Sequence, residues 1–179
     1  TAEDEFAGLA DPELLATEFP DLDLYHPWEL SIDEALAISK ECEAAALAMD
    51  PRISNSEGAT LNTEAGVGVY GNSNGFNHGY PISRHSISCS VIAKQKDEMQ
   101  RDYWYDSNRL PGEIADAETI GKRAAERTVA RLNGRKLGTR ECPVLYRADI
   151  APSLLRSLFG AIRGHAVYRK STFLLDQVG

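Results

Sequence analysis

Three glycines, Gly66, Gly68 and Gly71, have the spacing of a phosphate-binding loop in dinucleotide-binding proteins. In such a loop the backbone approaches a pyrophosphate at the N-terminus of a helix. The next residues, NSNGFNHGYP, are turn formers in which no helix can begin. No carboxylate follows in CSVIAKQ, about 20 residues beyond the glycines, where an acidic residue would hold the ribose. The pattern therefore indicates a twisted strand and then an exposed turn, and not a nucleotide site.

His85 and Cys89 are four residues apart, which would suit a shared metal ion if they lay on a helix. The stretch RHSISCSVIAK instead places apolar residues and mainly serines at alternate positions, a pattern that indicates a half-buried strand. At about 3.3 Å per residue in a strand, the two side chains are roughly 13 Å apart and cannot share an ion. The other histidines have no acid or thiol partner at ligand spacing, so all four are predicted to be structural or surface residues: His26, His78, His85 and His165.

The composition narrows the function further. The chain has 179 residues, with 27 acidic and 19 basic residues and a formal net charge of −8, which disfavours a general nucleic-acid binder. Its three cysteines contain no CxxC pair, which favours a reducing cytoplasm over a disulfide framework or a closed zinc site. No apolar run approaches the roughly 20 residues that span a bilayer, and no secretion signal opens the chain. We therefore expect a cytoplasmic protein that binds neither nucleic acid nor a membrane.

Four helices are predicted from their start signals. Asp11 and Pro12 begin one within LADPELLATEF, and Ser31 with Glu34 forms a capping box for a second over 31–50. Asp116 caps a third over 115–134, and Pro152 starts a fourth that Gly164 follows. Between the first two helices, prolines at 20 and 27 keep the chain extended. The second helix is expected to bury Ala35, Leu36, Cys42, Ala46 and Leu47, and the third Gly121, Ala125, Thr128 and Leu132.

Residues 52 to about 106 have a β pattern. RISNSEGATLNT reads as two strands joined by a tight turn at Ser56–Gly58, GVGVYG continues the second strand, and an Asn- and Gly-rich tip reverses the chain. RHSISCSVIAKQ and MQRDYWYDSN are two further strands, and the short connections imply antiparallel pairing. CPVLYRADI is expected to be a buried strand, and HAVYRKSTFLLDQVG to begin another. This order predicts an α+β fold in which an antiparallel sheet packs with helices.

Six segments together resemble the TldD/PmbA family of metalloproteases, specifically its PmbA (TldE) branch, over essentially the whole chain: ISNSEGA, GVYGNSNGF, RHSISCSVIA, RDYWYDSNR, IGKRAAERTVARLNGRK and CPVLYRADIAPSLLRSLFGAI. The resemblance implies that residues 1–179 are the central segment of a larger TldD/PmbA-type fold. Residues 1–50 would be a helical lead-in, 51–140 an antiparallel sheet plus a helix, and 141–179 the start of the next domain.

The resemblance also implies a function. Members of this family form a cytoplasmic TldD–PmbA heterodimer that acts as a metalloprotease on small or unfolded peptides, with roles in microcin maturation and antitoxin degradation. An older family label is "modulator of DNA gyrase". In TldD-type chains the motif His-Glu-x-x-x-His on a helix, with a distant cysteine, holds zinc, and its Glu can take the proton of the attacking water.

In this sequence the corresponding positions are Arg156, Ser157 and Ala161. The resemblance therefore implies a partner subunit without the metal-ligand motif and without catalytic residues of its own, with zinc in a TldD-like subunit. The strand with Gly66, Gly68 and Gly71 would contact a peptide or the partner chain.

Two alternatives stay open at this point. The chain can be an enzyme in its own right, with ligands assembled differently or downstream of Gly179. It can also be a peptide-binding regulatory module with no protease role. Metal content separates the first alternative from the partner-subunit hypothesis, because an independent enzyme would hold roughly one ion per chain.

Overall fold

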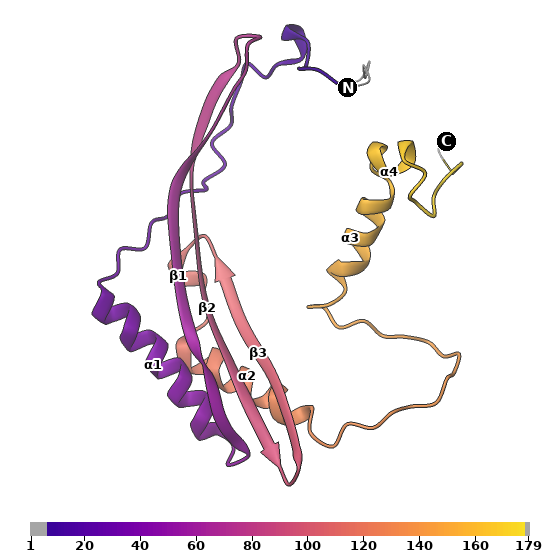
Figure 1. The fold of residues 1–179 in the computed structure, drawn as a ribbon. Helices are drawn as coiled ribbons and strands as arrows, with labels where there is room; N and C mark the ends of the chain where they lie inside the picture. The colour runs from indigo at the N-terminus through magenta and orange to yellow at the C-terminus, as the bar shows by residue number, and fades with distance from the viewer. Residues whose placement is uncertain (1–6, 178–179) are drawn as a thin grey trace. The chain divides into compact units, whose positions relative to one another are not determined.

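A three-stranded antiparallel sheet forms the centre of the first of two compact units in the computed structural model, which describes residues 7–177 (Figure 1). The strands are β1 (Ile53–Gly71), β2 (Asn77–Gln95) and β3 (Glu98–Asn108), in the order β1-β2-β3. The first unit ends at Arg135 and the second begins at Lys136. The two ends of the expected 1–179 segment, residues 1–6 and 178–179, lie outside the described residues.

Two helices of the first unit begin at the predicted caps. Before α1 (Ile32–Met49), the Ser31 hydroxyl accepts the backbone N–H of Glu34, and the Glu34 carboxylate accepts the N–H of Ser31, at 3.2 and 2.8 Å. This is the capping box that the sequence predicts. Before α2 (Ala117–Ala130), the Asp116 carboxylate accepts the backbone N–H three residues further on, at 2.7 Å. Both predicted helices are confirmed.

Helices α1 and α2 cover one face of the sheet (Figure 1). The predicted alternation in β2 is confirmed, because every second residue from His85 to Ala93 is buried on this face. In α1 the prediction is partly wrong, since Leu36 and Leu47 are exposed. The residues of α1 that are fully buried in the core have small side chains. The main core residues are Cys42 and Ala46 of α1, Ile87, Cys89, Val91 and Ala93 of β2, and Ile120, Ala124 and Ala125 of α2.

The backbones of the two helices lie close together at Gly121. A Cβ atom at this position would lie 2.0 Å from the carbonyl oxygen of Cys42, well inside the van der Waals distance. Only glycine lets the backbone of α2 lie this close to α1. The small residues that the sequence places on this side of α2 are therefore a helix-packing surface, and Gly121, Ala125, Thr128 and Leu132 are buried as predicted.

The tight turn predicted at Ser56–Gly58 is wrong, because β1 runs through these residues without a break. Ser56 pairs with Val91 and Gly58 with Ser90, so Glu57 is the extra residue of a β-bulge. Gly58 has a φ of 106°, a conformation that favours glycine. The same residue types that reverse a chain can also bend a strand, and here the pairing with β2 continues on both sides of the bulge.

The β1–β2 hairpin extends well beyond the end of β3. The last residue of β3, Asn108, pairs with His85, whereas β1 and β2 stay paired up to Gly71 and Asn77. We call residues 64–84 the arm. An extended segment that precedes α1, residues 7–30, lies alongside it and is called the strap (Figure 1). The backbone N–H of Ser83 donates to the carbonyl of Leu24 at 2.9 Å, so the strap bonds to β2 where β3 no longer does.

The remaining short elements differ from the prediction in several places. The first predicted helix is only a 3-10 turn, η1 (Pro12–Leu14), and a second such turn, η2 (Pro111–Glu113), follows β3. In the second unit, α3 (Pro152–Ala161) confirms the fourth predicted helix. The strand predicted at 142–150 is absent, with Leu145 95% exposed, and α4 (Gly164–Tyr168) takes the place of the last predicted strand.

The architecture of the described residues is α+β, which confirms the predicted fold class. Over residues 7–177, no helix combines the length and the apolar character that crossing a membrane requires.

Candidate functional site

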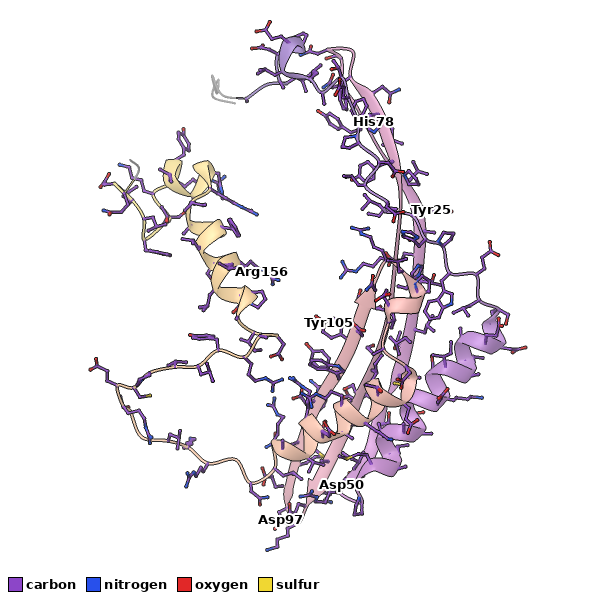
Figure 2. All side chains as sticks on the ribbon, turned by 180° about the vertical axis from the view of Figure 1, so that it is seen from behind. Tyr25, Asp50, His78, Asp97, Tyr105 and Arg156 are labelled. Atoms are coloured by element: carbon purple, nitrogen blue, oxygen red, sulfur yellow. The ribbon has the colours of Figure 1, made fainter. Side chains whose placement is uncertain are left out.

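Helix α3 carries the three positions that the family resemblance singles out, and Figure 2 labels Arg156 on it. Arg156 is exposed, whereas Ala161 is only 8% exposed. This difference is expected because five residues of α-helix rotate a side chain by roughly 140°. The Ser157 hydroxyl donates to the backbone carbonyl of Ser153 at 3.0 Å, which uses its only proton.

These side chains do not fit a zinc ion. A guanidinium is a permanent cation, a methyl group has no lone pair, and a neutral hydroxyl is a poor ligand. The zinc motif that the family resemblance implies would have two imidazoles and a carboxylate at these positions. Within residues 7–177 the structure also contains no group of three or more His, Cys, Asp or Glu side chains arranged to hold a metal.

Gly66, Gly68 and Gly71 lie in the arm, where they pair with Ile82, Tyr80 and Asn77. A turn at residues 72–76 follows Gly71 and leads directly into β2, so a strand and not a helix comes after these glycines. A Cβ atom at Gly66 would meet nothing within 4 Å, and one at Gly68 would lie 3.6 Å from the Tyr80 ring. No side chain projects from β1 at the three glycines, so another backbone can approach the arm there. Their contact with a peptide or with the partner chain stays a prediction.

Titration of the protein with NAD and with FAD is expected to give no saturable signal. The reason is that a dinucleotide loop needs a helix after the third glycine, and the structure has a hairpin turn there. Fluorescence or calorimetric titration measures this directly. Saturable binding in the micromolar range would contradict the assignment of these glycines to a strand surface.

His85 is a fully buried structural residue and not a metal ligand. Its Nε2 lies 2.8 Å from the carbonyl oxygen of His26, which can only accept, so Nε2 carries the proton. Its Nδ1 accepts from the Thr63 hydroxyl, also at 2.8 Å. Because both ring nitrogens are used, neither has a lone pair free for a metal. The ring instead ties β1, β2 and the strap together, and the Trp28 ring lies nearly perpendicular to it at a centroid distance of 5.7 Å.

The face of the sheet opposite the helices carries a polar groove that the sequence analysis missed. The bulge directs the Glu57 carboxylate across β2 to Arg101 of β3, with an N–O distance of 2.9 Å, and the Ser90 hydroxyl donates to it at 2.8 Å. These bonds, chiefly the one from Arg101, hold the pKa of Glu57 below its ordinary range. The rest of this hollow of about 610 Å³ is lined mainly by polar residues, namely Thr60, Ser88, Asp102, Tyr103 and Arg131, together with Gly58 and Cys89.

Glu57 and Arg101 are 44 residues apart in the sequence, so only the strand register brings them together. The signal that could have located them is the bulge at Ser56–Gly58, which the turn prediction concealed. The groove offers hydroxyl groups, two paired carboxylates and two guanidinium groups, a set suited to polar contacts with a peptide backbone.

Residues 25–132 match the family model of the PmbA/TldA metallopeptidase central domain. The chain is 48% identical over 179 residues to Metalloprotease PmbA of Escherichia coli O157:H7 and 43% identical over 179 residues to the Metalloprotease PmbA homolog of Haemophilus influenzae. Each match covers 100% of this chain and 40% of the relative, so the chain spans about two fifths of the length of these proteins.

Solved structures share the fold. A putative modulator of a DNA gyrase from Thermotoga maritima superposes with a TM-score of 0.79 at 21% identity, covering 92% of this chain and 38% of that one. TldE from Thermococcus kodakarensis superposes with a TM-score of 0.68 at 18% identity, covering 100% of this chain and 40% of that one. At these identities the two structures support the fold of the chain.

Proposed function

The chain belongs to the PmbA/TldD metallopeptidase family, and we infer from this that it is part of the non-catalytic subunit of a heterodimeric zinc metalloprotease. In this proposal it is the central segment of a PmbA-type protein that pairs with a TldD-like subunit. The TldD-like subunit holds the zinc, and the pair cleaves small or unfolded peptides in the cytoplasm. Microcin maturation and antitoxin degradation are the roles that the family resemblance implies.

One observation carries the proposal, namely the donor chemistry of α3. The family's metal helix supplies two imidazoles and a general base. At the same positions this helix supplies the guanidinium of Arg156, the Ser157 hydroxyl, which donates a hydrogen bond to a backbone carbonyl, and the methyl group of Ala161. None of the three side chains Arg156, Ser157 and Ala161 can hold a zinc ion or take the proton of an attacking water as a general base. In this proposal the chemistry comes from another chain, and the PmbA-type chain contributes structure and contacts.

The arm is the part of this chain that we assign to those contacts. Strand β1 is at one end of the three-strand order, so its outer edge has no strand neighbour among the described residues. Along this edge Gly66, Gly68 and Gly71 keep side-chain atoms out of the way of an approaching backbone. Val67, Val69 and Tyr70 between them are exposed apolar side chains. A peptide or the partner chain can therefore lie against this strand.

The alternative function is a peptide-binding regulatory module with no protease role. The polar groove at Glu57 and Arg101 favours it, because a peptide-binding surface needs polar groups but no metal. The two functions differ in the partner that they require. A protease subunit requires a chain with the zinc motif, and a regulatory module does not.

Zinc analysis of the native complex tests the proposal. The full-length protein is purified with its partners from its own cell, the subunits are separated, and zinc is measured in each. We expect zinc only in a partner whose sequence contains His-Glu-x-x-x-His, because α3 offers no ligands. One tightly held zinc in this subunit would instead support an independent enzyme. A complex without any chain that carries the motif would support the regulatory module.

A further inference from the structure

A hollow of about 550 Å³ lies between the strap and the arm, and the function proposed above does not use it. Residues 19–25 of the strap form one wall, and residues 78–81 of β2 form the other. Figure 2 labels Tyr25 on the strap and His78 on the arm, which mark these two walls. We call this hollow the strap pocket.

Aromatic rings line much of the strap pocket. Phe19 stacks on the ring of His78 with a centroid distance of 3.6 Å and an angle of 10° between the planes. Phe19, Tyr25 and Tyr80 are all partly exposed, although aromatic side chains of this size are normally well covered. Their faces carry partial negative charge, so they attract a cation that lies against them.

Carboxylates add full negative charge at the same place. Asp21 and Asp23 line the pocket, and no lysine or arginine does. The backbone N–H of Asp23 donates to the Asp21 carboxylate at 2.9 Å, which turns the chain so that the Asp23 side chain is 81% exposed. His26 lies close to Asp23, with its Nε2 3.2 Å from a carboxylate oxygen.

The strap around the pocket is negatively charged as well. The strap contains six acidic residues and no lysine or arginine, and the arm contains no Asp, Glu, Lys or Arg between its two ends, Glu64 and Arg84. The acids of the strap are Asp11, Glu13, Glu18, Asp21, Asp23 and Glu29. This region therefore attracts a positively charged ligand and repels phosphates and nucleic acids.

We propose that the strap pocket binds an arginine side chain presented by a partner polypeptide. A planar guanidinium can stack on an aromatic face and bond to a carboxylate at the same time, which an ammonium does less well. The methylene stem of arginine can pack on the apolar lining at Pro20 and Leu22. The exposed apolar residues Val67 and Val69 of β1 pair with Pro81 and Gly79 of the pocket wall, and apolar surface next to the wall suits a polypeptide better than a free small cation.

The proposal is tested by NMR titration of the ¹⁵N-labelled chain with the peptide acetyl-Gly-Gly-Arg-Gly-Gly-amide. The same peptide with citrulline in place of arginine is the neutral control, because citrulline keeps the shape and loses the charge. We expect chemical shift changes at residues 19–25 and 78–81 and an affinity about tenfold higher for the arginine peptide. Equal affinity for the two peptides, or shift changes confined to other parts of the chain, would overturn the proposal.

Two double variants separate the pocket from the general charge of the strap. Asp21→Asn with Asp23→Asn is expected to weaken arginine binding about tenfold. Both asparagines fit the backbone, since Asp23 has a φ of 49° and asparagine tolerates that conformation. Asp11→Asn with Glu13→Gln removes the same charge from strap residues outside the pocket and should change binding less than about twofold. If both double variants weaken binding equally, the attraction is non-specific and the strap pocket is not an arginine site.

Tyr80→Leu tests the aromatic contribution independently of net charge. Leucine keeps an apolar side chain on the exposed strand surface but has no ring face for the guanidinium. We expect a loss of about threefold or more in affinity for the arginine peptide, with affinity for the citrulline peptide little changed. An unchanged arginine affinity would show that the rings do not take part and would contradict the proposal.

Discussion

Replacing Gly121 with alanine is expected to lower the free energy of unfolding of the first unit by about 3 kcal/mol. The added methyl carbon would lie 2.0 Å from the carbonyl oxygen of Cys42, and both atoms belong to or adjoin rigid helix backbone. Neither can rotate away, so α1 and α2 must separate. Separation would open the contacts of Cys42 and Ala46, which are fully buried between the helices and the sheet.

Thermal unfolding measures the effect, with an expected drop in Tm of roughly 10 °C for a unit of this size. Gly160→Ala, in α3 of the second unit, is the control for adding a methyl group to a helix glycine, because a Cβ atom there would meet nothing within 4 Å. Alanine has the better helix propensity by about 1 kcal/mol, so this variant should be at least as stable as the wild type. An equal drop in Tm for the two variants would mean that the close contact between α1 and α2 at Gly121 does not explain the loss of stability.

Peptide cleavage is expected only when the full-length protein is mixed with a TldD-like subunit. Alone, it should cleave no peptide, because α3 offers neither zinc ligands nor a general base at Arg156, Ser157 and Ala161. Arg156→Ala should leave most of the activity of the mixed pair intact, since the Arg156 side chain is exposed and is assigned no catalytic step. A fluorogenic peptide assay on each subunit alone, on the wild-type mixture and on the mixture with the Arg156→Ala variant measures these activities.

A complementary variant restores the family's motif residues as Arg156→His, Ser157→Glu and Ala161→His. We expect only weak zinc binding, because the third ligand and the supporting hydrogen bonds are missing. Position 161 is also buried, so a histidine there must displace its neighbours before it can reach a metal. One tightly held zinc in the lone wild-type subunit, or loss of cleavage in the Arg156→Ala pair, would show that α3 belongs to the catalytic machinery.

The sequence predicts those elements whose signals are local. The capping box at Ser31, the cap at Asp116 and the alternation through β2 each involve residues within a few positions of one another, and all three are present. The prediction was wrong at Ser56–Gly58, because a turn and a bulge use the same residue types. Only the partner strand decides between them, and that information lies more than 30 residues away.

The candidate sites show the same limit. Arg156, Ser157 and Ala161 were identified from the family resemblance, and they lie on the predicted helix. The pair of Glu57 and Arg101 and the walls of the strap pocket depend on strand register and on how the strap lies beside β2. Neither can be derived from spacing along the chain. The segment 142–150 has the apolar residues of a strand but forms none, because strand formation depends on a neighbour with which to pair.

The long outer edge of β1 also has a consequence for handling this protein. Unpaired backbone donors and acceptors along an edge strand are a template for pairing with other copies, and the part from Ala65 to Gly71 has no charged side chain to prevent it. The bulge at Glu57 and the carboxylate of Glu64 interrupt the edge nearer its start. We therefore expect aggregation of the chain to begin at the stretch GVGVYG. Val67→Lys or Val69→Lys would place a positive charge on this edge, and repulsion between the lysines of neighbouring copies would oppose amyloid-like stacking.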